Sequence, residues 1–167
     1  YQKASLILLE EIKKNENICI LGDYDVDGTC ATSLLVRYFN HINQKHFFYI
    51  PDRVEDGYGA SKNLIQKLLL KKPKLVIIVD SGSTSNEAID YLNQLNIRSI
   101  IIDHHEINKP YPKSNALINP KKKLINEENS YLCATALTYF FIDILIKATK
   151  SNFKLSNFLI YVLLATI

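Results

Sequence analysis

Short apolar runs alternate with longer amphipathic segments through the first two thirds of the sequence, and this alternation constrains the fold more than any other feature. The runs lie at 18–21, 47–50, 75–79 and 99–102, with a short fifth run at 116–118, and helix-like segments separate the first four at about 29–42, 60–71 and 84–95. Apolar strands joined by amphipathic helices are typical of a parallel sheet covered on both faces. The sequence therefore predicts an α/β fold in which a parallel sheet of about five strands has helices on both faces.

The rest of the chain is expected to complete the same domain. Residues 108–130 are polar and contain several Pro and Lys residues, which indicates a long surface connection, and mostly apolar helices are expected at about 131–149 and 155–167. The length suits a single domain over residues 1–167. Because the sequence has no Met and stops inside an apolar run without a helix stop signal, we expect a piece of a longer protein, truncated at both ends.

Composition excludes several classes of protein. Hydrophobic residues make up 47% of the chain, so it can bury a core and is not intrinsically disordered. Three Cys without a CxxC pair argue against a disulfide scaffold or a structural zinc site. Residues 1–14 are amphipathic rather than signal-like, and the longest apolar stretch, 158–167, is far below the roughly twenty residues of a membrane span. We therefore expect a cytoplasmic protein without a membrane partner; its net charge of +3 permits a nucleic-acid partner without indicating one.

Acidic or imidazole side chains follow each of the first four apolar runs. In chain order they are Asp23, Asp25 and Asp27, then Asp52 and Asp56, then Asp80, then Asp103, His104 and His105. The carboxyl ends of parallel strands meet at one edge of a sheet, where ligands bind. Carboxylates gathered there would repel one another unless a cation lay among them. The placement of these residues therefore predicts a metal site.

The motif Asp23-x-Asp25-x-Asp27-Gly28 has two simpler interpretations. Any one of its Asp residues could cap the next helix, but three alternating carboxylates without a cation are unfavourable. An EF-hand calcium loop also begins in this way, yet it needs a Glu where this chain has Leu34, and a helix where we expect a strand. Metal ligation by at least two of the three is the interpretation that we retain.

Asp80 and the triplet 103–105 are the other candidate ligands. Ser or Thr residues at 81 and 83–85 could cap the next helix, which leaves Asp80 free for a metal. Adjacent His residues in a loop are often incidental, but the preceding Asp103 and the other clusters favour a role for them. A site rich in oxygen ligands with one His favours Mn²⁺ or Mg²⁺ over Zn²⁺. His41 and His46 are predicted to be surface or packing residues.

The three motifs at 22–29, 79–82 and 103–105 resemble those of the DHH phosphoesterase family. Within the family the chain looks most like the RecJ single-strand-specific exonucleases, because of the form Gly-Asp-Tyr-Asp-Val-Asp-Gly, the segment from Pro51 to Gly59 and the segment 116–120. The likeness covers residues from about 16 to 167. It implies that the predicted sheet is a DHH phosphoesterase domain.

The resemblance also implies a two-metal site that holds Mn²⁺ or Mg²⁺. Asp25 would bind one metal, with Asp23 beside it. Asp27 and His104 would bind the other metal, and Asp80 would bridge the two. Two such ions generate a hydroxide and stabilise the charge that develops on the phosphate.

Two further roles and two departures from the family pattern follow from the same resemblance. Asp103 would orient its loop, and His105 would reach the scissile phosphate, so that the implied catalytic residues are Asp25, Asp27, Asp80, His104 and His105.

RecJ proteins usually have a Gly-rich segment where this chain has 132–136. The family's further Asp ligand would come just after Ile167, and its second domain is absent, so we expect one ligand to be missing and the isolated chain to bind at most one metal well.

The function implied is metal-dependent phosphodiester hydrolysis by a 5′–3′ exonuclease specific for single-stranded DNA, in recombination and repair. Its partners would be single-stranded DNA, a single-strand-binding protein and a helicase. One alternative is another DHH phosphoesterase that acts on short RNA or small nucleotides, although the first motif of those relatives usually opens with a His and a Pro-Asp-Gly-Asp-like run. The other alternative is a catalytically inactive DHH domain that serves as a binding module, which loss of metal ligands would mark.

Overall fold

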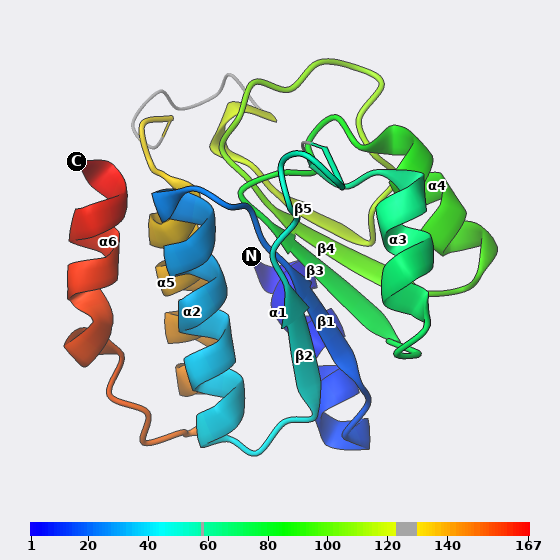
Figure 1. Cartoon of the computed structure of the whole chain (residues 1–167). Helices are drawn as coiled ribbons and strands as arrows, with labels where there is room; N and C mark the ends of the chain where they lie inside the picture. Colours follow the sequence, from blue (N-terminus) through cyan, green and yellow to red (C-terminus); the bar gives the residue numbers. More distant parts are fainter. Residues whose placement is uncertain (58, 123–129) are drawn as a thin grey trace.

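The computed structural model describes residues 1–57, 59–122 and 130–167 of the chain. A five-stranded parallel sheet in the order β2-β1-β3-β4-β5 forms its centre (Figure 1). The strands are β1 (Ile18–Leu21), β2 (His46–Tyr49), β3 (Leu75–Val79), β4 (Arg98–Ile102) and β5 (Ala116–Ile118). The predicted parallel sheet of about five strands is confirmed, and each strand lies within one residue of its apolar run.

Helices cover both faces of this sheet, as predicted (Figure 1). They are α1 (Gln2–Lys14), α2 (Val26–His41), α3 (Lys62–Leu69), α4 (Asn86–Gln94), α5 (Ala134–Thr149) and α6 (Leu159–Thr166), with short 3-10 turns η1 (Pro120–Lys122) and η3 (Leu155–Phe158). Alternate strand residues point to opposite faces, so Ile18 and Ile20 pack with α1, α2 and α5, whereas Cys19 and Leu21 pack with α3 and α4. The sheet is therefore buried between two apolar layers.

The strand order determines where a ligand site can form. From β1 the chain crosses through α2 to β2 on one side, and then through α3 to β3 on the other side of β1. The loops that follow β1 and β3 therefore lead to helices on opposite faces, because α2 packs in one layer and α4 in the other. Such a switch point opens a crevice at the carboxyl ends of the strands.

The later part of the chain differs in detail from the sequence-based expectation. Besides the predicted fifth strand, the connection at 108–130 contains the turn η1, and the last predicted helix begins as the turn η3 before α6. Tyr58, in the segment from Pro51 to Gly59, and residues 123–129 of the predicted connection lie outside the described residues. Within the three described ranges, no helix is long and apolar enough to cross a membrane.

The two His residues outside the motifs have packing roles, as predicted. His41 Nε2 lies 2.9 Å from Asn152 Oδ1, and the His41 ring packs against Phe153. The His46 ring packs edge-on against Phe39, and its Nδ1 lies 2.7 Å from the main-chain oxygen of Gln44. Neither residue belongs to a group of potential metal ligands among the described residues.

Candidate metal centre

The loop after β1 holds the first group of carboxylates. Asp25 has an extended backbone, and its carboxylate accepts a hydrogen bond from Gly28 N at 2.9 Å, so it caps α2 and starts the helix three residues before the predicted position. Asp23 is buried and accepts from Tyr24 N at 2.7 Å. A Cβ on Gly28 would lie within 2.6 to 2.8 Å of Asp23 atoms, so only Gly allows the loop to pack this tightly.

Asp80, at the end of β3, is the most deeply buried of the predicted metal ligands. Its backbone is in the left-handed region with φ of 59°, and the residue is only 1% exposed. Neither of its carboxylate oxygens accepts a hydrogen bond from a described residue. The residue that precedes α4 is Ser85, so Asp80 does not cap that helix, as the sequence predicted. A buried carboxylate without donors fits a cation ligand, because it is otherwise costly.

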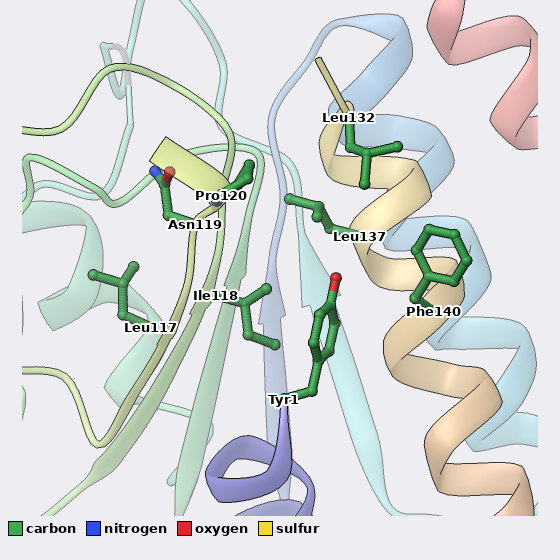
Figure 2. A pocket seen from close by; sticks show the side chains of 8 residues that line it. All are labelled: Tyr1, Leu117, Ile118, Asn119, Pro120, Leu132, Leu137 and Phe140. Carbon is green, nitrogen blue, oxygen red and sulfur yellow. The ribbon is translucent and has the colours of Figure 1, made fainter. Parts of the chain in front are cut away.

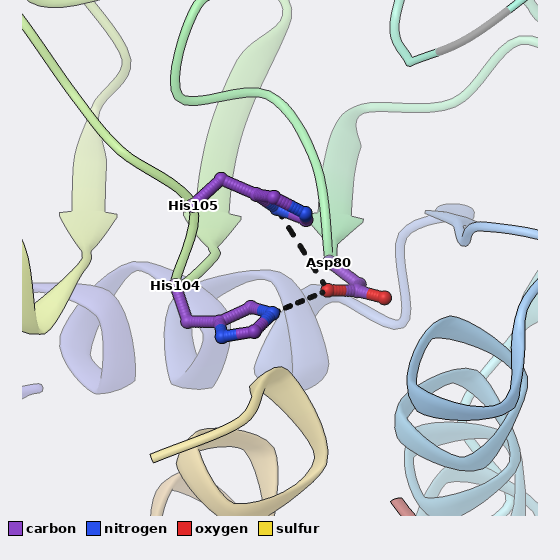
Figure 3. Close-up of side chains that lie close together, drawn as sticks. All are labelled: Asp80, His104 and His105. Carbon is purple, nitrogen blue, oxygen red and sulfur yellow. Dashed lines mark ion pairs between the residues drawn. The ribbon is translucent and has the colours of Figure 1, made fainter. Parts of the chain in front are cut away.

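Asp80 belongs to two groups of potential ligands. Its ligand atom lies within 4.8 Å of those of Asp23 and Asp25 in one group, and of His104 and His105 in the other. Figure 3 shows both imidazoles turned toward the Asp80 carboxylate, with His104 Nε2 3.3 Å from Asp80 Oδ1. The predicted placement of these residues at one edge of the sheet is therefore confirmed, while their roles stay predictions.

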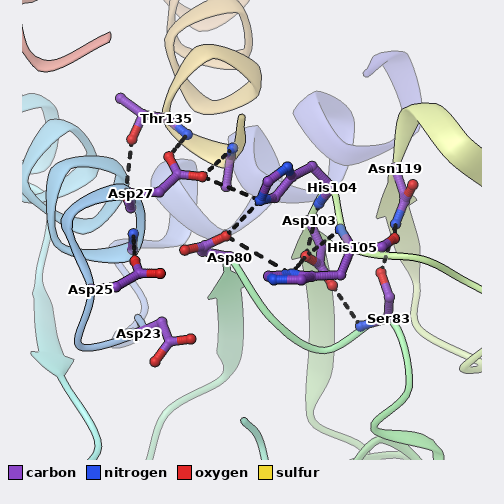
Figure 4. A network of polar contacts seen from close by, with 12 residues as sticks. Asp23, Asp25, Asp27, Asp80, Ser83, Asp103, His104, His105, Asn119 and Thr135 are labelled. Carbon is purple, nitrogen blue, oxygen red and sulfur yellow. Dashed lines mark hydrogen bonds and ion pairs between the residues drawn. The ribbon is translucent and has the colours of Figure 1, made fainter. Parts of the chain in front are cut away.

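Asp27 joins the cluster from the other side of His104. Its Oδ2 lies 3.5 Å from His104 Nε2 (Figure 4). The same carboxylate accepts hydrogen bonds from the backbone N–H groups of Ala134 and Thr135, each at 2.7 Å. The sequence analysis missed these two donors, because backbone groups at the start of an apolar helix leave no mark in the sequence.

Asp103 organises the loop that carries the two His residues. Its Oδ1 accepts from His104 N at 2.8 Å and His105 N at 3.2 Å and lies 2.8 Å from His105 Nδ1, while Oδ2 accepts from Ser83 N at 2.9 Å. Burial alone would raise the pKa of Asp103, but the hydrogen bonds from His105 and Ser83 outweigh it and hold that pKa below its usual value. In return, the bond with Asp103 raises the pKa of His105.

Asn119, just after β5, is a further residue that the sequence analysis did not assign to the site. Its Nδ2 donates to Ser83 Oγ at 2.8 Å and to the main-chain oxygen of His105 at 3.0 Å, and its Oδ1 accepts from Lys121 N at 2.8 Å. One amide side chain thus ties together the loops after β3, β4 and β5 (Figure 4). Its position directly after the predicted fifth strand is the sequence feature from which Asn119 could have been assigned to the site.

The second acidic cluster does not join the metal centre, which corrects the expectation that all four clusters share a cation. Asp56 accepts from Tyr49 Oη at 2.7 Å and from Asp52 N at 3.0 Å, and Lys67 Nζ lies 3.1 Å from its other oxygen. The hydrogen bond from Tyr49 is the main reason that the pKa of Asp56 is lowered. Lys67 on α3 therefore supplies the positive charge that the sequence argument assigned to a metal.

The residues present at Asp80 fit a divalent cation. Burial, followed by the negative charges of Asp27 and Asp25, raises the pKa of Asp80 to about 9. Burial also raises the pKa of Asp23. Several carboxylates with one or two imidazoles are the donor set that suits Mn²⁺ or Mg²⁺. Without a cation, this cluster retains a proton at neutral pH.

The raised pKa of Asp80 predicts a pH-dependent response to metal. Between its ordinary pKa near 4 and its folded pKa of about 9, the metal-free fold binds a proton that the unfolded chain lacks, so its stability falls as pH rises through that window. A metal displaces this proton, so its apparent affinity should rise by up to about tenfold per pH unit. Thermal unfolding with and without Mn²⁺ at pH 6 and pH 8 should give the larger stabilisation at pH 8; an equal shift at both would contradict the assignment.

A separate cavity of about 470 Å³ lies between β5 and α5 (Figure 2). The Tyr1 ring stands in it between Ile118 and Leu137, and Asn119 and Pro120 lie at one end. Its walls are mostly apolar and include none of the clustered Asp and His residues. This cavity is therefore not the metal centre.

Comparison with known proteins places the chain in a family. The DHH family, N-terminal domain, matches residues 17–167. The single-stranded-DNA-specific exonuclease RecJ of Escherichia coli is 29% identical over 140 residues, which are 83% of this chain and 24% of that protein. RecJ of Bacillus subtilis is 33% identical over 121 residues, 72% of this chain and 15% of that protein. The chain thus spans about a quarter or less of the length of these curated relatives.

The fold also matches a solved structure. The crystal structure of exonuclease RecJ bound to manganese superposes with a TM-score of 0.79 and 26% sequence identity, over 88% of this chain and 37% of that one. The family match and the structural match therefore agree with the resemblance that the motifs at 22–29 and 103–105 indicated.

Proposed function

The chain belongs to the DHH family, and we propose that it hydrolyses the phosphodiester bonds of single-stranded DNA, using Mn²⁺ or Mg²⁺ held around Asp80. The observation that carries the proposal is Asp80 itself. It lies in both ligand groups, is buried, and has two oxygens without hydrogen-bond donors among the described residues. The RecJ relatives, which are named as single-stranded-DNA-specific exonucleases, support the choice of substrate.

The proposed ligands divide into two sets that share Asp80. Asp23 and Asp25 lie on one side of it, and His104 with Asp27 on the other. When bound, a pair of divalent ions lowers the pKa of a water and offsets negative charge on the phosphate. The chain itself orients these ligands: Gly28 N holds Asp25, and the start of α5 holds Asp27.

His105 is proposed to contact the phosphate rather than a metal. It is exposed, and its Nδ1 faces Asp103 Oδ1 at 2.8 Å. Because Asp103 raises the pKa of His105, the imidazole is more readily protonated at neutral pH and can donate a hydrogen bond to a phosphate oxygen. Asp103 acts through His105 and does not touch substrate in this proposal.

The wider biological role rests on the resemblance to RecJ. It comprises 5′–3′ polarity, recombination and repair in the cytoplasm, and partnership with a single-strand-binding protein and a helicase. The proposal also treats residues 1–167 as one DHH catalytic domain of a longer protein, with a further Asp ligand after Ile167 and a second domain elsewhere in that protein.

A nuclease assay on the full-length protein tests the proposal. With Mn²⁺, a single-stranded DNA oligonucleotide labelled at its 5′ end should release labelled mononucleotide first, while the matching duplex should be resistant. Hydrolysis of short RNA or dinucleotides in preference to DNA would favour the alternative phosphoesterase. Absence of hydrolysis on every substrate, with the fold intact, would instead favour the inactive binding module.

A further inference from the structure

Asp27 is joined to α5 by three hydrogen bonds that span more than a hundred residues of sequence. Ala134 N donates to Oδ2 and Thr135 N donates to Oδ1, each at 2.7 Å. Thr135 Oγ1 donates to the main-chain oxygen of Asp27 at 2.9 Å. These bonds are buried, and Figure 4 shows the carboxylate of Asp27 facing the start of α5.

The start of α5 lacks a side-chain cap of its own. Its N-cap residue is Cys133, which makes no capping hydrogen bond, so the carboxylate of Asp27 occupies the place of a cap. The amino end of a helix also carries partial positive charge, and α5 is 16 residues long. The helix therefore both satisfies and partly neutralises this one carboxylate of the cluster.

The bonds also determine which way Asp27 faces. Oδ2, the oxygen that accepts from Ala134 N, is the one that lies 3.5 Å from His104 Nε2. With both oxygens held from the side of α5, the carboxylate plane is fixed, and its Oδ2 faces His104. By contrast, neither carboxylate oxygen of Asp80 accepts a hydrogen bond from a described residue.

We propose that the first turn of α5, through Ala134 N, Thr135 N and the Thr135 hydroxyl, is the positioning element that presents Asp27 as a metal ligand beside His104. This inference rests on the proposed metal function. It assigns a role to a segment where RecJ-like sequences usually have Gly residues, and it makes Thr135 a positioning residue rather than a packing residue. Partners that orient metal ligands typically change metal affinity by about 10- to 100-fold when they are removed.

The chain offers a matched pair of variants on the same helix. Thr135 and Thr138 are both fully buried, but the Thr138 hydroxyl has no hydrogen-bond partner among the described residues. Thr135→Val removes the hydroxyl bond to the main-chain oxygen of Asp27 and keeps the Thr135 N–H that donates to the carboxylate. Thr138→Val removes a hydroxyl without a hydrogen-bond partner among the described residues, with the same change of shape. Thr135→Ser keeps the hydroxyl and serves as the rescue variant.

Ala134→Pro removes a backbone donor directly. Ala134 is the first residue of α5, a position where Pro is well accepted, and Cys133 before it is already extended with ψ of 164°. The substitution deletes the N–H that donates to Asp27 Oδ2 and places a methylene there. Its expected effect is therefore larger than that of Thr135→Val.

Calorimetric titration of the full-length protein with Mn²⁺, together with metal-free thermal unfolding, tests the inference. We expect Ala134→Pro and Thr135→Val to weaken Mn²⁺ binding by about tenfold or more, with Thr138→Val and Thr135→Ser within about twofold of wild type. Unchanged Mn²⁺ affinity in Thr135→Val, or an equal loss in Thr138→Val, would overturn the inference while leaving the metal site standing. A wild-type protein that binds no Mn²⁺ would overturn the proposed function as well. If Ala134→Pro does not fold, the two Thr→Val variants decide.

Discussion

Replacing Asp80 by Asn in the full-length protein should abolish hydrolysis while leaving the fold intact. Asn has nearly the same shape and tolerates the left-handed backbone at this position, where φ is 59°. Among the described residues, Asp80 is common to both ligand groups, so its loss removes an anionic ligand from each. Removing a residue that only orients a metal ligand lowers metal affinity or activity by about 10- to 100-fold. Because Asp80 is itself a proposed ligand, we expect its replacement to lower activity by more than about a hundredfold.

The same substitution should make the metal-free protein more stable. At pH 7 the folded state takes up a proton on Asp80, because its pKa is about 9, and this costs a few kcal/mol relative to the unfolded chain. Asn carries no charge, so the metal-free melting temperature should rise and the stabilisation by Mn²⁺ should disappear. Asp90→Asn, at an exposed position on α4, is the matched control and should change neither quantity. Activity close to wild type in Asp80→Asn would refute the assigned role.

Replacing Asp103 by Asn should have the second largest effect, through His105. Asp103 is buried and accepts from the backbone of Ser83, His104 and His105, and lies 2.8 Å from His105 Nδ1. An Asn amide has one acceptor oxygen, so its NH₂ group must face at least one of these donors. We expect activity to fall by about a hundredfold or more, as when an Asp that orients a catalytic His is replaced, and stability to fall by about 1–3 kcal/mol.

The pH dependence separates orientation from simple instability in the Asp103→Asn variant. The bond with Asp103 raises the pKa of His105, so its removal should lower that pKa. The imidazole would then lose its proton at lower pH, and the alkaline limb of the rate profile should move to lower pH with it. NMR titration of the His105 ring measures the same shift directly. An unchanged His105 pKa would show that Asp103 supports only the loop.

The fold was largely predictable because the sheet is parallel and buried on both faces. Strands such as Leu75–Val79 must then be continuously apolar, and the acidic residues of the candidate site follow the strand ends. The helix boundaries were less accurate. Asp25 starts α2 through a side-chain cap at a position that the sequence analysis weighed mainly as a metal ligand.

The candidate site was predictable to the extent that it is made of side chains at strand ends. The same reasoning failed for Asp56, because the pairing of this residue with Lys67 depends on how α3 packs beside β2. It also missed Ala134 and Thr135, whose backbone groups meet Asp27 only when α2 and α5 pack together. Contacts between backbone and side chain across the fold follow from packing, which residue types alone do not reveal.

The central claim is that Asp80 holds divalent metal between two sets of ligands. Anomalous diffraction from crystals of the full-length protein soaked in Mn²⁺ tests it most directly. The account predicts manganese in contact with an Asp80 oxygen, with Asp25 on one side and with Asp27 and His104 on the other. Manganese bound elsewhere on the chain, or density around Asp80 that stays empty of metal while the protein hydrolyses single-stranded DNA, would contradict it.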